Sequence, residues 1–157
     1  MKTFVLTCSL FAALVLPAFA KARDVTFTTE LQNYGGDGAY LALYLTDAAG
    51  EYQGTLWVSG KKSKYYKHLG GWARGSRLDP EEYDGLTGAS VTSGRTLKIT
   101  LNLDDSLIDN GYEVRVDSAV EDMRDIRADV IAPLTTEGSG KPVSGRGYVR
   151  ALTYELQ

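Results

Sequence analysis

The chain has 157 residues and a formal charge of −3, from 17 basic and 20 acidic side chains with one histidine. This acidic balance argues against a nucleic-acid-binding protein, because phosphate contacts need an excess of lysine and arginine. Seventeen glycines and ten tyrosines beside only four prolines are typical of a turn-rich β protein and not of a disordered chain.

Residues 1–20 have the pattern of a secretory signal peptide. Lys2 supplies the positive start, residues 4–16 are mostly apolar, and Pro17 leads into small residues that mark a cleavage site near Ala20. The apolar run is shorter than the ~20 residues that a membrane-spanning helix needs. We therefore expect an exported, periplasmic protein that does not span the membrane.

The only cysteine, Cys8, lies inside this segment. The rest of the chain therefore has no disulfide, no thiol nucleophile and no thiolate metal site. Lys2 is the only charged residue before Lys21, so residues 21–157 carry 16 basic and 20 acidic side chains and a formal charge of −4. This length is sufficient for one hydrophobic core, and we expect a single β-sandwich domain over residues 21–157.

Apolar and polar residues alternate along much of this region, which is the period of a half-buried strand. The predicted strands cover residues 25–31, 40–45, 52–58, 97–103, 112–116, 130–134 and 148–156. A hairpin turn at 47–50 separates the second strand from the third. On one side of the last strand we expect Tyr148, Arg150, Leu152, Tyr154 and Leu156. These short strands predict an antiparallel β-sandwich of immunoglobulin-like type, without deciding the strand order.

A short helical insertion is predicted between the third and fourth strands. Tyr65, Leu69 and Trp72 are spaced four and three residues apart, and we expect this helical stripe to pack on the sheet. Gly70 and Gly71 weaken the end of that helix. Basic residues surround the stripe and are interpreted as a solvated face, with attraction of a phosphate or an acidic partner left open. They are Lys61, Lys62, Lys64, Lys67, Arg74 and Arg77.

The insertion ends in a brief helical turn and a distinctive motif. Asp79 is expected to cap the turn, with Pro80 at its first helical position. The chain then reads Asp84-Gly85-Leu86-Thr87-Gly88-Ala89-Ser90. This order of an acid, two free positions, a hydroxyl residue, glycine, alanine and a final hydroxyl residue resembles the acceptor site of ApbE-type FMN transferases. Those enzymes join FMN to a protein hydroxyl through a phosphoester.

The resemblance implies a covalent FMN on Ser90, at a position where the acceptor pattern more often has threonine. Asp84 and Thr87 complete the pattern. Gly88 and Ala89 leave the backbone open around the acceptor hydroxyl, and glycine tolerates the sharp turn that presents it. The alternative is a plain turn between two core elements, since all these residues are common in turns.

A flavin ring needs aromatic or apolar faces on which to stack. Tyr66 and Tyr83 lie near the acceptor in sequence and outside the helical stripe, so they are the predicted contacts of the ring. His68, the only histidine, is interpreted as a surface or packing residue, because no cysteine or second histidine completes a transition-metal site. No pattern indicates a catalytic triad, and we expect no enzyme activity.

Four segments together resemble a periplasmic family known only as domain of unknown function 2271. They are Ala39–Asp47, Thr55-Leu56-Trp57, Lys64–Arg74 and Asp84–Ser90. Members of that family tend to be encoded beside PepSY-type membrane reductases and FMN transferases, often in iron-linked settings. The resemblance therefore implies a role in extracytoplasmic electron transfer, with a transferase and a membrane reductase as partners.

Two functions follow as expectations. The first is a periplasmic electron carrier whose flavin is tethered at Ser90, so that the cofactor stays next to its partner. The second is a non-redox binding or accessory module linked to iron or haem uptake, which the β-rich pattern and the basic insertion also fit.

Overall fold

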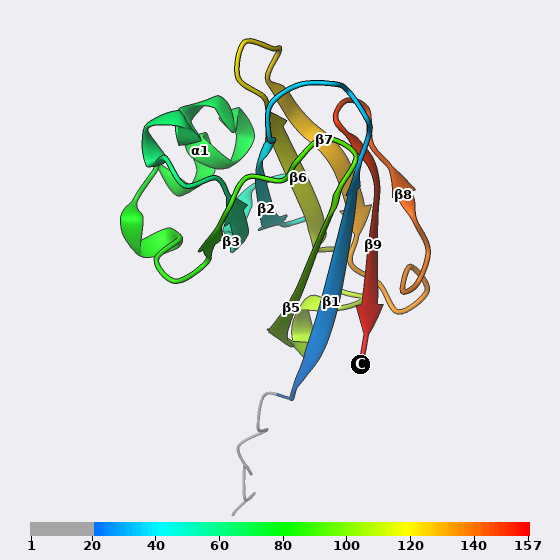
Figure 1. The fold of residues 1–157 in the computed structure, drawn as a ribbon. Coiled ribbons are helices and arrows are strands. Elements are labelled where there is room, and N and C mark those ends of the chain that lie inside the picture. The colour runs from blue at the N-terminus through cyan, green and yellow to red at the C-terminus, as the bar shows by residue number, and fades with distance from the viewer. Residues whose placement is uncertain (1–20) are drawn as a thin grey trace, which may run out of the picture.

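The computed structural model describes residues 21–157, so the predicted signal peptide lies outside the described residues. Two β-sheets form two layers, and a helical segment lies on the outer face of one of them (Figure 1). The four-stranded sheet has the order β5 (Thr96–Asp104), β1 (Ala22–Leu31), β9 (Val149–Leu156), β8 (Val143–Ser144). The five-stranded sheet has the order β4 (Thr87–Gly88), β3 (Tyr52–Ser59), β2 (Tyr40–Thr46), β6 (Glu113–Ala119), β7 (Ile126–Pro133).

The predicted β-sandwich is confirmed. All strand pairs are antiparallel apart from β3 and β4, which run parallel. A parallel neighbour needs a long crossover, and the helical insertion supplies it by returning the chain to the free edge of β3. The sequence motif Asp84–Ser90 contains β4, so the insertion decides where this motif lies.

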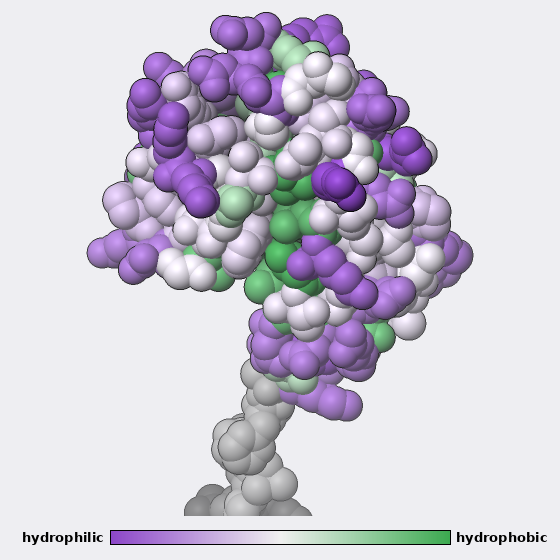
Figure 2. Space-filling model, in the orientation of Figure 1, coloured by the Kyte–Doolittle hydropathy of each residue, from purple (hydrophilic) through white to green (hydrophobic). Residues whose placement is uncertain are grey.

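Inward-facing side chains of both sheets share one hydrophobic cluster. Phe27 and Leu152 from one sheet and Leu41 and Val116 from the other are fully buried in it. Leu97 of β5 is only partly buried against the cluster. Apolar side chains are visible between the two layers in Figure 2. Strand β4 has only two residues, so it pairs with only a short part of the edge of β3.

The predicted alternation of the last strand is wrong at one residue. Arg150 is exposed, whereas Leu152 and Tyr154 face the core. The pairing of β1 with β9 shifts register here, because Glu30 pairs with Ala151 while Leu31 pairs with Val149. The extra residue is a β-bulge, which turns the Arg150 side chain to solvent.

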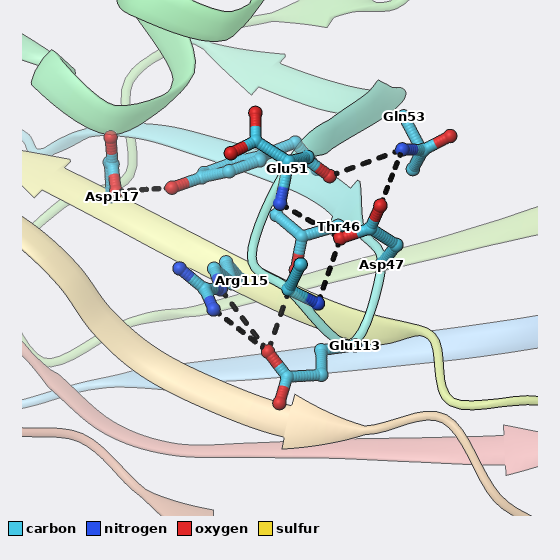
Figure 3. A network of polar contacts seen from close by, with 9 residues as sticks. Thr46, Asp47, Glu51, Gln53, Glu113, Arg115 and Asp117 are labelled. Carbon is cyan, nitrogen blue, oxygen red and sulfur yellow. Dashed lines mark hydrogen bonds and ion pairs between the residues drawn. The ribbon is translucent and has the colours of Figure 1, made fainter.

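The hairpin turn between β2 and β3 is confirmed. Asp47 Oδ1 accepts hydrogen bonds from the backbone N–H groups of Ala49 and Glu51, both at 2.9 Å. Gln53 Nε2 donates to the other oxygen of the same carboxylate at 3.2 Å, and the whole turn is visible in Figure 3. Gly50 adopts a positive φ of 82°, which closes the turn in a conformation that suits glycine.

The helical insertion consists of η1 (Ser63–His68), α1 (Gly70–Ser76) and η2 (Pro80–Glu82), and a further short helix, η3 (Asp105–Leu107), follows β5. The first three cover the outer face of the five-stranded sheet (Figure 1). They bury a second cluster of side chains against that face. Its members are Ala42, Tyr44, Val58, Tyr66, Leu69, Trp72 and Ala119.

The glycines expected to weaken the end of a helix instead begin one. The cause lies on strand β6, where the Asp117 carboxylate accepts hydrogen bonds from Gly71 N at 2.6 Å and Trp72 N at 2.8 Å. These are first-turn donors that have no partner within the helix. A Cβ on Gly71 would lie 2.8 Å from Asp117 Oδ2, so the close approach of the helix requires glycine there.

Candidate functional site

The motif Asp84–Ser90 runs along the outer edge of β3. Asp79 caps η2 as predicted, because its side chain accepts a hydrogen bond from Glu81 N. After this turn, Leu86 O accepts from Val58 N at 2.9 Å and Gly88 O accepts from Gly60 N at 2.8 Å. The chain then passes from β3 to the start of β2, where Val91 and Ala39 form a backbone bridge.

Ser90 is exposed, and the geometry on both sides explains why. Val91 points into the core, and successive side chains of an extended chain point to opposite faces, so Ser90 points outward. Its side chain lies against Gly38, where a Cβ would come within 2.8 Å of Ser90 Oγ and 3.2 Å of Ser90 Cβ. A residue without a side chain at position 38 therefore leaves the Ser90 hydroxyl unobstructed.

Packing against Trp57 explains why position 88 is a glycine. A Cβ at this position would lie 2.7 Å from the ring of Trp57, which donates from Nε1 to Ser59 Oγ at 3.2 Å. Gly88 is therefore needed for β4 to pack beside β3, and this requirement is independent of any modification of Ser90. Ala89 is exposed.

A shallow hollow of about 270 Å³ lies beside the motif. It brings together four of the residues predicted for the site, which are Tyr66, Tyr83, Asp84 and Thr87, and Pro80, Glu81 and Gly85 line it as well. Asp84 and Thr87 are exposed, and Tyr83 is half-buried. Ser90 and Ala89 do not line the hollow; they follow Thr87 along the chain.

One tyrosine of the hollow, Tyr66, differs from the expectation, and so does its neighbour in sequence, Tyr65. Tyr66 was predicted to be free of the packed helix face, but it is only 3% exposed and donates its hydroxyl to Gly60 O at 2.8 Å. Burial raises the pKa of Tyr66. Tyr65, assigned to the packed stripe, is the half-exposed residue, because η1 is a 3₁₀ helix with three residues per turn and the stripe does not continue through it.

A cluster of aromatic side chains supports the hollow, and two of its supporting residues, Tyr52 and Glu82, were not singled out from the sequence. The rings of Tyr66 and Tyr83 meet edge to face with centroids 5.3 Å apart, and Trp72 packs against both at 5.6 Å. Tyr52 donates from its hydroxyl to Glu82 at 2.6 Å, and burial, followed by this bond, raises the pKa of Tyr52. The cluster of Tyr66, Trp72 and Tyr83 therefore lies beside a hydrogen bond that joins β3 to η2.

His68 lies outside this hollow. It is exposed, and its Nδ1 lies 2.9 Å from Asp125 Oδ2. Within residues 21–157 no three side chains of histidine, cysteine, aspartate or glutamate come together in a way that could hold a metal ion. The lysines of the insertion are exposed, and Lys64 Nζ lies 4.8 Å from the centroid of the Tyr65 ring.

The family comparison agrees with the resemblance read from the sequence. Residues 22–151 match the model of a family described as "Predicted periplasmic protein (DUF2271)". No curated protein and no solved structure matches the chain. None of the helices in the described region has the length and apolar character needed to cross a membrane. Because the match spans most of the chain, this protein belongs to the DUF2271 family of predicted periplasmic proteins.

Proposed function

We propose that this protein is a periplasmic electron carrier with FMN attached to Ser90 through a phosphoester. An ApbE-type FMN transferase would attach the flavin, and a membrane PepSY-type reductase would exchange electrons with it. The observation that carries the proposal is the exposed Ser90 hydroxyl at the last position of a matching acceptor motif. A buried hydroxyl at this position would have been incompatible with entry into a transferase active site.

The residues present fit the attached group. Attachment forms a bond between Ser90 Oγ and the FMN phosphorus, displaces the leaving group that this phosphorus carries in the donor, and releases the hydroxyl proton to a base of the transferase. The hollow beside Thr87 is lined by both Tyr66 and Tyr83, and the half-buried Tyr83 is the ring available to stack on a flavin, since Tyr66 is only 3% exposed. When bound, the flavin supplies the redox chemistry, and the protein supplies attachment and surroundings.

Co-expression with an ApbE-type transferase in the periplasm tests the proposal. We expect the intact mass of the purified protein to rise by one FMN phosphoester, with a yellow colour, and Ser90→Ala to lose both. Ser90→Thr should keep them, because it retains the alcohol and restores the residue more usual in the acceptor pattern. Thr92→Ala, at an exposed hydroxyl two residues further on, is the matched control and should be modified normally. An unmodified wild-type mass, or FMN mapped to another residue, rules the proposal out.

Gly38→Ala should slow attachment of FMN without unfolding the protein. The φ angle of Gly38 lies outside the left-handed region, so alanine can adopt it, but the new methyl group must displace the Ser90 side chain. We expect a roughly tenfold lower initial rate of modification, because a displaced nucleophile loses its alignment with the donor. The rate is read from a time course of intact mass with purified transferase.

Gly54→Ala is the control for this change, since a Cβ at Gly54 meets nothing within 4 Å. It should be modified at the wild-type rate. Equal rates for Gly38→Ala and wild type would show that the clearance beside Ser90 has no part in acceptor recognition.

A further inference from the structure

A second pocket, of about 240 Å³, opens between η1 and the connection from β6 to β7. Tyr40 and Tyr65 form its aromatic side, with their rings edge to face and their centroids 5.7 Å apart. Both rings are half-buried, so part of each is available to a ligand. The pocket has none of its lining in common with the hollow beside Ser90.

The remaining apolar lining comes from the end of β6 and the turn that follows it. Ala119 and Val120 are buried and line the pocket, while Met123 is 41% exposed at its rim. Met123 is one of three exposed large apolar side chains in the described region. A thioether adapts its shape and makes favourable contacts with aromatic rings, so this rim suits a ligand with an apolar or aromatic body.

The polar part of the lining is one histidine, His68, and three carboxylates. Glu121, Asp122 and Asp125 all line the pocket and are all exposed. Asp125 lies 2.9 Å from His68, whereas Glu121 and Asp122 form no ion pair within residues 21–157. Two unpaired carboxylates beside tyrosine rings favour a cationic group and repel an anionic one.

Tyr65 already receives ammonium groups on its ring within the protein. The Nζ atoms of Lys64 and Lys62 lie 4.8 and 6.0 Å from its centroid, which is the range in which a cation is attracted to a tyrosine face. This is the geometry of a ring that attracts cations. Neither lysine lines the pocket, so the carboxylates dominate the charge of the lining itself.

We propose that this pocket binds a small organic ammonium compound with a single aromatic ring. The aromatic body lies between Tyr40, Tyr65 and Met123, and the ammonium group points to Glu121 and Asp122. The volume of the pocket suits one ring and a short chain, since it lies just below the usual range for drug-sized ligands. This site is independent of Ser90 and of any flavin.

Three probes that share a phenylethyl body and differ in charge test the proposal by titration followed through protein NMR shifts. They are 2-phenylethylammonium, neutral 2-phenylethanol and 3-phenylpropionate. We expect the ammonium compound to bind most tightly, with shifts centred on Tyr40, Tyr65 and Met123. The double change Glu121→Gln with Asp122→Asn should weaken its binding roughly fivefold, because each exposed charge contributes modestly. Tyr65→Ala should abolish detectable binding.

Two control variants separate this site from the rest of the molecule. Glu155→Gln removes an exposed charge on β9 and should leave the affinity unchanged, as should Ser90→Ala. The proposal is overturned if the carboxylate probe binds as tightly as the ammonium probe, if the double variant keeps the wild-type affinity, or if the shifts centre on Tyr83. Both changed carboxylates are exposed, so the double variant is expected to fold normally.

Discussion

Asp117→Ala is expected to lower the free energy of unfolding by about 3–5 kcal/mol, because it leaves four buried or partly buried donors without a partner. The Asp117 carboxylate is 1% exposed and points toward α1 (Figure 3). Besides Gly71 N and Trp72 N it accepts from Ala128 N at 2.7 Å and from the Tyr44 hydroxyl at 3.0 Å. Burial, and then this carboxylate, raises the pKa of Tyr44.

One side chain therefore ties the helical insertion and β7 to the centre of the sheet. The loss is to be measured by urea unfolding at equilibrium. Asp117→Asn should cost roughly half as much, because it keeps one of the two accepting oxygens and places an NH₂ group against the other donors. Glu155→Ala, an exposed control, should stay within about 0.5 kcal/mol of wild type. An unchanged unfolding midpoint for Asp117→Ala would mean that water replaces the carboxylate at no cost.

Asp129→Ala is expected to destabilise the protein by a similar amount, about 3–5 kcal/mol, and to loosen the entry into β9. Asp129 on β7 is fully buried and accepts from the backbone N–H groups of Arg146 and Gly147 at 2.7 Å and of Val149 at 3.0 Å. Ser118 Oγ also donates to it, at 2.6 Å. Because β7 and β9 belong to different sheets, this carboxylate joins the two layers.

Hydrogen exchange read by mass spectrometry separates the local effect from the global one. Asp129→Ala should speed exchange at residues 145–149 more than elsewhere. Ser118→Ala, which removes one donor and keeps the carboxylate, should cost about 1 kcal/mol and leave exchange at these residues slow. If exchange at 145–149 in Asp129→Ala rises only as much as in the rest of the sandwich, the carboxylate has no special role in holding this segment.

Local patterns in the sequence predicted most of the elements. Alternating apolar residues, and for residues 40–45 an apolar run on both faces, located the seven long strands, and the Asp79–Pro80 pair located η2, because these signals depend on neighbours within a few residues. Helical spacing gave the wrong exposure for two tyrosines. Tyr65, expected to be packed, is half-exposed, and Tyr66, expected to be free, is buried. A heptad-like stripe assumes a continuous α-helix, and the chain instead changes from a 3₁₀ helix to an α-helix at Leu69.

The chemistry of the candidate site was also only partly accessible from the sequence. The order of residues from Asp84 to Ser90 identified the acceptor motif, since such a pattern is a property of consecutive residues. The role of Gly38 was hidden, because it lies 52 positions before Ser90 and meets it only through the bridge between Ala39 and Val91. Asp117 and Asp129 were hidden for the same reason, since their partners come from other strands and helices.

The sequence by itself determined that this chain is a β protein with a helical insertion, which alcohol is the proposed acceptor, and which family the protein belongs to. The tertiary structure alone decided that this alcohol is exposed, that β4 joins its sheet in parallel, and which two carboxylates hold the layers together. The physical reason is range: alternation, caps and motifs act between neighbours along the chain. Burial and hydrogen-bond satisfaction depend on residues that are brought together only when the two sheets pack.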